Sequence, residues 1–350
     1  MTPPIILNPG TDLPFPTSLP EFMRLFPNDE ACGTYLENIR WPSGFVCPWC
    51  RVAGLPYRFA AKPGVLRCKA CKKDVGLTAG TVMERSHTPL STWFWAAYLV
   101  SSLTPGMSAV QFQRQLGLGR YETAFQILHK LRAGMVRPVR DRIGGKHPIE
   151  LDETWVGGRT RGEGKGRHHK TLVICAVEVR KRDGSEPPED AQSKAKPRRG
   201  GRYAGRLRLA VVPNRKAATL IQWTRENIER PSKITTDDWS GYDRLHEDGH
   251  WHTHVDERGD PAVAEEHLPL IHLIYSNLKA WINGVHHGVA PQHLQAYLNE
   301  FTFRFNRRFY PFNAFRSLLG IGGGAESPTY ADLYSGEWQH PGSTTASGHG

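Results

Sequence analysis

The sequence lacks the marks of a membrane or secreted protein. No run of about 18 apolar residues occurs in it, which excludes a membrane-spanning helix. Its start, Met1-Thr-Pro-Pro-Ile-Ile, has no charged segment followed by an apolar one, so we expect no signal peptide. Only six cysteines occur in 350 residues, and they do not form a disulfide framework of the kind found in secreted proteins. We therefore expect a protein of the reducing cytoplasm.

Acidic residues are scarce relative to basic ones. Lys and Arg number 45 against 34 Asp and Glu, which gives a formal net charge of +11 and a pI near 9.4. Such an excess is typical of proteins that bind nucleic acids, because Lys and Arg release counterions from phosphates. A basic ribosomal factor would carry the same excess, so charge favours a polyanionic partner without defining the function.

Four of the six cysteines form two C-x-x-C pairs. Cys47 and Cys50 are separated from Cys68 and Cys71 by 17 residues, a spacing typical of structural zinc sites closed by four thiolates. Redox-active dithiols are the alternative, but they would not require two matched pairs. We expect a zinc ribbon over residues 46–80. The basic residues of its second half indicate contact with phosphates, unless the ribbon is purely structural; they are Arg67, Lys69, Lys72 and Lys73.

Residues 88–140 have the pattern of a helical segment with three helices. The second helix is expected over Ser108–Leu116, and a turn with two glycines precedes a third helix over about Tyr121–Met135. Two helices joined by a short turn indicate a helix-turn-helix, a common DNA-binding motif. Lys130 and Arg132 on the third helix are candidates for contact with DNA phosphates. The alternative is an ordinary three-helix packing unit.

From residue 147 the pattern changes to that of an α/β domain with a mixed sheet. The expected order is three strands, a helix, a fourth strand and further helices. The strands are expected from Ile149, over 172–179, over 207–212 and over 233–237, and the helix over 217–228. We expect this domain to span 147–320 with a mobile insert over 181–204. Residues 1–45 are expected to form a helical lead-in, and 321–350 a partly disordered tail.

Two aspartates occupy strand positions in this basic protein. Asp152 follows Ile149 and Leu151 in an apolar strand, and Asp237 ends the strand that begins at Lys233. A buried carboxylate is costly unless it is paired or binds a metal. For one such acid an ion pair with a nearby arginine is the commoner explanation, but two on separate strands favour a site for Mg²⁺. Two such ions commonly serve in cutting and joining phosphodiesters.

Five segments carry a resemblance to a known family. They are Arg40-Trp-Pro42, Gly44-Phe-Val-Cys-Pro-Trp-Cys50, Thr236-Asp-Asp-Trp-Ser-Gly-Tyr242, Ser276-Asn-Leu-Lys-Ala-Trp-Ile-Asn-Gly-Val-His-His-Gly288 and Gln295-Ala-Tyr-Leu-Asn-Glu-Phe-Thr-Phe-Arg-Phe-Asn-Arg-Arg308. Together they resemble the zinc-ribbon, ISXO-type insertion-sequence transposases, a group of the DDE superfamily. The resemblance covers roughly residues 19 to 335, and it is the joint set of segments that is specific.

The resemblance implies an RNase H-like catalytic domain and the function of a DNA transposase of a bacterial insertion sequence. It implies cleavage at the element's ends with two Mg²⁺ or Mn²⁺ ions, then transfer of the freed 3′-hydroxyl to target DNA. The implied partners are the terminal inverted repeats, the target DNA and further copies of the chain, as a homodimer or higher oligomer in the nucleoid. Asp152 and Asp237 match the first two family carboxylates.

The third active-site position departs from the family pattern. Members with Glu there carry it seven residues before a Lys, and in this chain His272 holds that position relative to Lys279. Another branch has Asn in a Ser-Asn-x-Lys motif, which matches Asn277. Seven residues are almost two helical turns, so His272 and Lys279 share a face and Asn277 points elsewhere. We favour His272 and keep both; because neutral imidazole is a poor Mg²⁺ ligand, Mn²⁺ is expected to support more activity.

Glu300, Arg304 and Arg307 match a trio of the same family and are spaced to share one face of a helix. The implied role is that Glu300 orients an arginine, which then binds a phosphate through two hydrogen bonds. The alternative is a solvated face with one weak ion pair. Opposite this trio we expect an apolar stripe of Leu298, Phe301 and Phe305.

Two other functions fit parts of the sequence. A zinc-ribbon DNA-binding regulator with an inactive RNase H-like domain would need no third acid, and a nuclease would hydrolyse DNA without joining it. The basic, glycine-containing segment 159–170 is expected to grip DNA near the active centre, or else to form a solvated hairpin.

Overall fold

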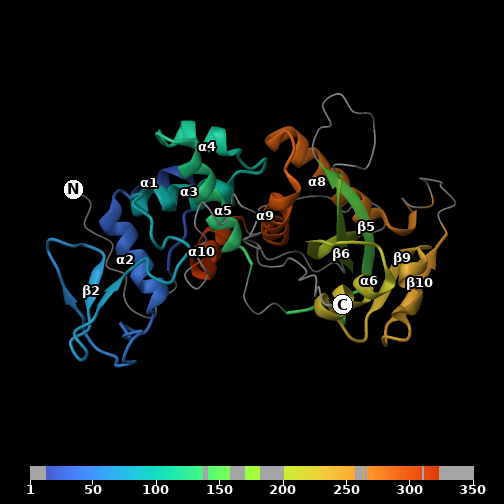
Figure 1. Ribbon diagram of the computed structural model, residues 1–350, viewed down its shortest axis with the longest axis horizontal. Coiled ribbons are helices and arrows are strands. Elements are labelled where there is room, and N and C mark those ends of the chain that lie inside the picture. Colours follow the sequence, from blue (N-terminus) through green and yellow to red (C-terminus); the bar gives the residue numbers. More distant parts are fainter. Residues whose placement is uncertain are drawn as a thin grey trace. The chain divides into compact units, whose positions relative to one another are not determined.

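The computed structural model describes residues 13–136, 141–157, 170–181, 201–256, 263, 266–309 and 311–322, which form two compact units (Figure 1). The N-terminal unit contains the described residues up to 136 together with 311–322. The second unit contains those from 141 to 309. Among the described residues, no helix is both long and apolar enough to cross a membrane.

An aromatic cluster forms the core of the N-terminal unit. Phe22 stacks on Tyr98 with ring centroids 4.5 Å apart, and Phe26 lies 4.9 Å from Phe94. Phe315 joins them from the last helix, 5.5 Å from Phe26. The helices that supply and surround these rings are α1 (Leu19–Leu25), α2 (Asp29–Arg40), α3 (Leu90–Ser102) and α10 (Pro311–Gly322).

The placement of α10 corrects the expected domain boundary at residue 320. The sequence assigns residues 311–320 to the catalytic domain, but α10 packs on α3 and α2, and Phe315 is buried among their rings. Full burial of a Phe side chain stabilises a fold by about 1.5–3 kcal/mol. The burial of Phe315 therefore favours packing of α10 in the N-terminal unit. Of the tail expected over 321–350, residues 321 and 322 belong to α10, and 323–350 lie outside the described residues.

The expected helix-turn-helix is present in the N-terminal unit. It consists of α4 (Ala109–Gln115) and α5 (Tyr121–Ala133), which pack against each other. Ser108 caps α4 by accepting a hydrogen bond from the backbone N–H of Gln111 at 3.2 Å. Gly117 has a φ of +60° in the turn, a left-handed conformation that favours glycine.

Lys130 and Arg132 lie inside the N-terminal unit and not on its surface. Their exposed fractions are 3% and 1%, and Lys130 Nζ donates a hydrogen bond to the backbone oxygen of Glu84 at 3.0 Å. Burial lowers the pKa of Lys130. The prediction that these two side chains bind DNA phosphates is therefore wrong, because a phosphate cannot reach them. The exposed part of α5 is its start, around Arg120 and Tyr121.

A five-stranded mixed sheet, with the strand order β10-β9-β5-β6-β7, forms the second unit. β5, β6 and β7 are an antiparallel meander, whereas β9 runs parallel to β5 and β10 parallel to β9. The strands are β5 (Ile149–Gly157), β6 (Lys170–Lys181), β7 (Arg202–Val211), β9 (Lys233–Asp237) and β10 (Trp251–Val255). This confirms the expected mixed α/β, RNase H-like domain, to which β10 adds a strand that the sequence did not predict.

The expected insert after β6 is shorter than 181–204. β6 continues to Lys181 and β7 begins at Arg202, and residues 182–200 between them lie outside the described residues. Two short strands pair apart from the main sheet, β4 (Ile143–Gly144) and β8 (Ile228–Glu229).

Helices cover both faces of the sheet (Figure 1). They are α6 (Ala217–Asn227), α8 (Pro269–His286) and α9 (Leu294–Asn306), with the 3-10 segments η1 (Ser240–Leu245) and η2 (Pro291–His293). On β5, Val156 packs toward α8 and α9, and Leu151 toward α6. Because side chains alternate along a strand, the even-numbered residues of β5 face α8 and the odd-numbered ones face α6.

Polar side chains of α9 complete the hydrogen bonding of the edge strand β7. Gln295 accepts a hydrogen bond from the N–H of Val211 at 2.8 Å. Asn306 accepts one from the N–H of Leu207 at 2.7 Å and donates one to its carbonyl at 3.1 Å. These contacts occupy backbone groups that an edge strand otherwise leaves open to another chain.

A buried acid on β6, Glu178, forms hydrogen bonds with residues of β4, β6 and β7. Glu178 has a fully buried side chain that accepts hydrogen bonds from Arg180, Arg206 and the N–H of Gly144. Burial raises the pKa of Glu178, but the hydrogen bonds from Arg206, Arg180 and Gly144 outweigh it and bring the pKa to about 2.

Replacement of Glu178 by Gln is expected to destabilise the second unit in a pH-dependent way. The folded-state pKa lies below the ordinary value of 4.5, so the carboxylate stabilises the fold above pH 4.5 and loses this effect as the pH falls toward 2. Allowing for solvent around the arginines, the contribution is about 2 kcal/mol. Urea unfolding should show this difference between wild type and Glu178→Gln at pH 7 and a smaller one at pH 3. An equal difference at both pH values would contradict the ion-pair argument.

Candidate metal centres and active site

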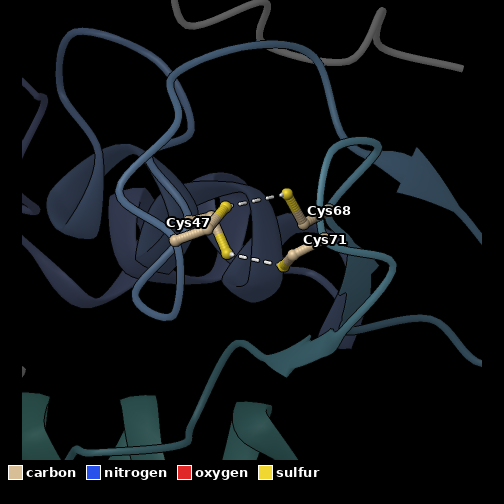
Figure 2. A group of neighbouring side chains, drawn as sticks. Cys47, Cys68 and Cys71 are labelled. Carbon is tan, nitrogen blue, oxygen red and sulfur yellow. Dashed lines mark hydrogen bonds between the residues drawn. The ribbon is translucent and has the colours of Figure 1, made fainter.

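The four predicted zinc ligands meet in one cluster. The Sγ atoms of Cys47, Cys50, Cys68 and Cys71 all lie within 4.8 Å of one another. Figure 2 shows the cluster, with Cys47 Sγ 3.7 Å from Cys71 Sγ and Cys50 Sγ 3.7 Å from Cys68 Sγ. Tetrahedral zinc with Zn–S bonds of about 2.3 Å holds its sulfurs about 3.8 Å apart. The donor set and its spacing therefore fit zinc.

The two cysteine pairs have the same backbone conformation. In the first, Arg51 has a φ of 61° and its N–H donates to the carbonyl of Cys47 at 2.9 Å. In the second, Lys72 has a φ of 60° and its N–H donates to the carbonyl of Cys68 at 3.0 Å. The second pair lies in the turn between β2 (Val65–Arg67) and β3 (Asp74–Gly76). Strand β1 (Tyr57–Arg58) pairs with the other edge of β2. Two matched turns aim four thiols at one point, as a zinc ribbon requires.

Asp152 and Asp237 lie at equivalent positions on adjacent parallel strands. β5 and β9 pair with Ile149 opposite Ile234, and each aspartate follows its member of that pair by three residues. The same register pairs Glu150 with Thr235, so strand alternation directs both aspartates toward the α8 side of the sheet. A cation site shared by the two aspartates would require adjacent strands and a common face of this kind.

Arg215, which is not among the residues predicted from the sequence, lies beside Asp237. Its Nη2 is 3.9 Å from Asp237 Oδ2, and its Nε contacts Glu153. Burial raises the pKa of Asp237, whereas the N–H of Trp239, Arg215 and His272 lower it, and the net pKa lies above the ordinary value. Arg215 follows β7 in a short loop, where the sequence offers no periodicity that would connect it to a distant acid.

Glu153 belongs to the opposite face, as alternation along the strand predicts. It accepts a hydrogen bond from the hydroxyl of the buried Tyr242 and pairs with Arg215. Burial raises its pKa, and the hydrogen bond from Tyr242 opposes this rise. Asp238, the other neighbouring acid, is exposed and lies 4.0 Å from His254. Glu153 therefore points to the face opposite Asp152, and Asp238 lies beyond the last residue of β9.

α8 brings two of the predicted site residues to these strands. Lys279 Nζ donates a hydrogen bond to Thr154 Oγ1 at 2.9 Å. Burial and the nearby Lys170 lower the pKa of Lys279, and Asp152 acts against this shift. His272, seven residues earlier, is half-buried and lies near enough to Asp237 to influence its pKa. Asn277 is exposed on another face of α8.

Glu150 connects β5, the strand that carries Asp152, to the start of α8 through two hydrogen bonds. Its Oε2 accepts hydrogen bonds from the N–H groups of Leu270 and Ile271 at 2.9 and 2.8 Å, at the first turn of α8. Burial raises the pKa of Glu150 to about 7, although these two hydrogen bonds lower it. Glu150 is not among the residues predicted from the sequence, although an acid two positions before Asp152, on the same face of the strand, was a signal for it.

The trio on α9 is more buried than its charge suggests. Glu300 is 1% exposed and accepts a hydrogen bond from Arg304 Nη1 at 3.4 Å. Arg307 stacks on Phe303, with its Cζ 3.9 Å from the ring centroid. The expected apolar stripe is only partly correct, because Leu298 is buried but Phe301 and Phe305 are half-exposed; Phe303 is the buried ring.

Of the predicted basic segment 159–170, Lys170 is the residue that the structure describes. Lys170 begins β6, and residues 158–169 lie outside the described residues. Among the described residues, the four cysteines are the group in which three or more metal-ligating side chains surround one point. A Mg²⁺ ion held by Asp152 and Asp237 would have two protein ligands and would take water and substrate phosphate as its others.

A zinc ribbon together with an RNase H-like sheet that carries aspartates on two adjacent parallel strands is a combination found in nucleic-acid-processing proteins. Comparison with known proteins narrows this class. Residues 143–306 match the model of the ISXO2-like transposase domain, and residues 27–74 match the transposase zinc-ribbon domain. The chain belongs to the zinc-ribbon, ISXO-type insertion-sequence transposases.

One curated relative is similar along most of its length. It is an "uncharacterized protein in transposable element ISH50" of Halobacterium salinarum, 25% identical over 302 residues, which cover 81% of this chain and 92% of the relative. No solved structure matches the chain.

Proposed function

We propose that this transposase cleaves the ends of its insertion sequence with divalent cations and joins the freed 3′-hydroxyl to target DNA. The observation that supports this most is the placement of Asp152 and Asp237 at equal register on β5 and β9, facing α8. Oxygen ligands in this arrangement suit Mg²⁺ or Mn²⁺. When bound, such ions supply activated water and stabilise the entering and leaving oxygens of a phosphodiester.

The protein's own groups have distinct parts in this proposal. Asp152 and Asp237 hold the cations, and Lys279 presents its ammonium to the DNA backbone beside them. Arg215, 3.9 Å from Asp237, neutralises that carboxylate in the free protein. Glu300 holds Arg304, so that this guanidinium or that of Arg307 can bind a phosphate. The zinc ribbon either contacts DNA phosphates or serves only to stabilise the N-terminal unit.

The proposal is tested with purified full-length protein, Mg²⁺ or Mn²⁺, and labelled DNA that carries the element's ends. Nicks that leave a 3′-hydroxyl, followed by joined products, are the expected result. Binding without cleavage would instead indicate a regulator, a reading that the absence of a third acid favours. Cleavage without joining would indicate a nuclease.

His272 is proposed as the third active-site residue in place of Asn277. It shares the face of α8 with Lys279 and lies near Asp237, where it can hold a metal-bound water or the scissile phosphate. His272→Ala is expected to slow Mn²⁺-supported cleavage on the order of a hundredfold. Asn277→Ala, its matched control on the same helix, should cleave at nearly the wild-type rate.

A second variant sharpens this prediction. His272→Glu restores the family carboxylate, so it is expected to raise activity with Mg²⁺ relative to Mn²⁺. If Asn277→Ala were inactive and His272→Ala active, the Asn branch of the family would describe this chain instead.

A further inference from the structure

A hollow lies beside Asp237, next to the paired aspartates. It has a volume of about 380 Å³ and is lined by Arg215, Lys216, Ala217, Trp239, Ser240 and Gly241. Its size falls in the range of small-molecule sites. Trp239, one of its lining residues, follows Asp237 by two positions. The backbone N–H of Trp239 donates a hydrogen bond to Asp237 Oδ1 at 3.3 Å.

Trp239 is held in a fixed orientation although it is 38% exposed. Its Nε1 donates a hydrogen bond to the carbonyl of Arg215 at 3.1 Å, and the Arg215 guanidinium lies 4.1 Å from its ring centroid. An exposed aromatic ring that is fixed from two sides is costly to leave in water and ready to stack on a ligand.

Gly241 makes room for this orientation. A Cβ at this position would lie 2.7 Å from Trp239 Nε1 and 2.9 Å from Leu220 Cδ1. Both distances are too short for real contacts, so any other residue would displace the indole. The glycine is therefore needed for the close approach of the ring and not for an unusual backbone conformation.

The chemistry of the lining selects an unpaired nucleotide. The face of the indole that Arg215 does not cover can stack on nucleobases of any sequence, while the ammonium of Lys216 suits a neighbouring phosphate. Bases in a duplex are already stacked on each other and cannot offer their faces, so the ligand must be single-stranded.

We propose that Trp239 is a stacking platform for an unpaired DNA base next to the phosphodiester at Asp237. This inference rests on the proposed function, because it assigns the ligand to DNA held at the active site. Trp239 would keep a strand end apart from its complement while the adjacent phosphate stays near the aspartates.

The test compares three DNA ligands in full-length protein that carries Asp152→Asn, so that nothing is cleaved. They are a blunt duplex, the same duplex with a short single-stranded oligothymidine extension, and the extended duplex with abasic sites in place of the thymines. Fluorescence anisotropy gives the Kd of each. The oligothymidine extension is expected to tighten binding, and the abasic extension is not.

Variants of Trp239 and Gly241 test whether the tighter binding of the extended duplex depends on the indole ring of Trp239. Trp239→Ala should weaken binding of the extended duplex at least about fivefold and leave the blunt duplex unchanged, in line with stacking on aromatic side chains. Trp239→Phe should keep most of the gain, and Gly241→Ala should lose it by moving the indole. Trp251→Ala is the matched control, because Trp251 is 59% exposed at the opposite end of the parallel strands.

Two outcomes would overturn the inference: an abasic extension that binds as tightly as oligothymidine, or Trp239→Ala protein that keeps the full gain. The measurement needs no catalysis. A protein that shows the Trp239-dependent gain but never cleaves DNA would refute the proposed reaction alone, and one that cleaves without the gain would refute the stacking platform alone.

Discussion

Asp152→Asn protein is expected to bind DNA and to cleave none of it. The substitution keeps the size of the side chain but removes the negative charge that, in the proposed function, binds a divalent cation together with Asp237. The loss in rate should be on the order of a thousandfold or more, as for other groups whose interactions matter chiefly in the transition state. Gel-based cleavage of labelled element ends measures the rate, and anisotropy measures binding.

Asp238→Asn is the matched control for this experiment. Asp238 adjoins Asp237 but is exposed, lies beyond the last residue of β9 and is 4.0 Å from His254. Its replacement should leave cleavage close to the wild-type rate. Retained cleavage in Asp152→Asn, or equal loss in both variants, would remove the basis for the metal assignment.

Cys68→Ser protein is expected to lose its zinc and, with it, the ordered ribbon of β1, β2 and β3. Three thiolates and a hydroxyl bind zinc far more weakly than four thiolates, and zinc binding is coupled to folding in small domains of this kind. The metal contributes on the order of 10 kcal/mol in isolated zinc fingers, and the hairpin alone has a small core to replace it. Zinc content by mass spectrometry of the intact protein measures the loss.

Cys32→Ala separates loss of zinc from a general effect of removing a cysteine. Cys32 is fully buried in α2, and burial is the main reason that its pKa rises to about 12, so it is a core thiol and not a ligand. This variant should keep one zinc per chain. Zinc content that stays at one per chain in Cys68→Ser would disprove the four-thiolate site.

Features of local sequence were predictable because each carries its own signal. The two C-x-x-C pairs fix their own geometry through matched turns at Arg51 and Lys72. The β-branched runs predicted β6 and β7, and Ser108 predicted the start of α4. The pattern also predicted that Asp152 and Asp237 lie on two separate strands, whereas the register between these strands is seen only in the structure.

Features that depend on tertiary contact could not be read in this way. Lys130 and Arg132 are cations on a helix with a periodic apolar face, and only the packing of the unit reveals that they are buried. β10 consists of Trp-His-Thr-His-Val and lacks apolar alternation, because its side chains are largely exposed at the edge of the sheet. Arg215 and Glu150 act through partners that lie far away in the chain.

The account depends on a cation shared by Asp152 and Asp237. Titration of Mn²⁺ followed by electron paramagnetic resonance, with a short DNA duplex present, counts the bound ions in wild type, Asp152→Asn, Asp237→Asn and the double variant. A shared site predicts that either single substitution removes the bound Mn²⁺ and that the double variant loses no more. Mn²⁺ binding that persists in both single variants would contradict it.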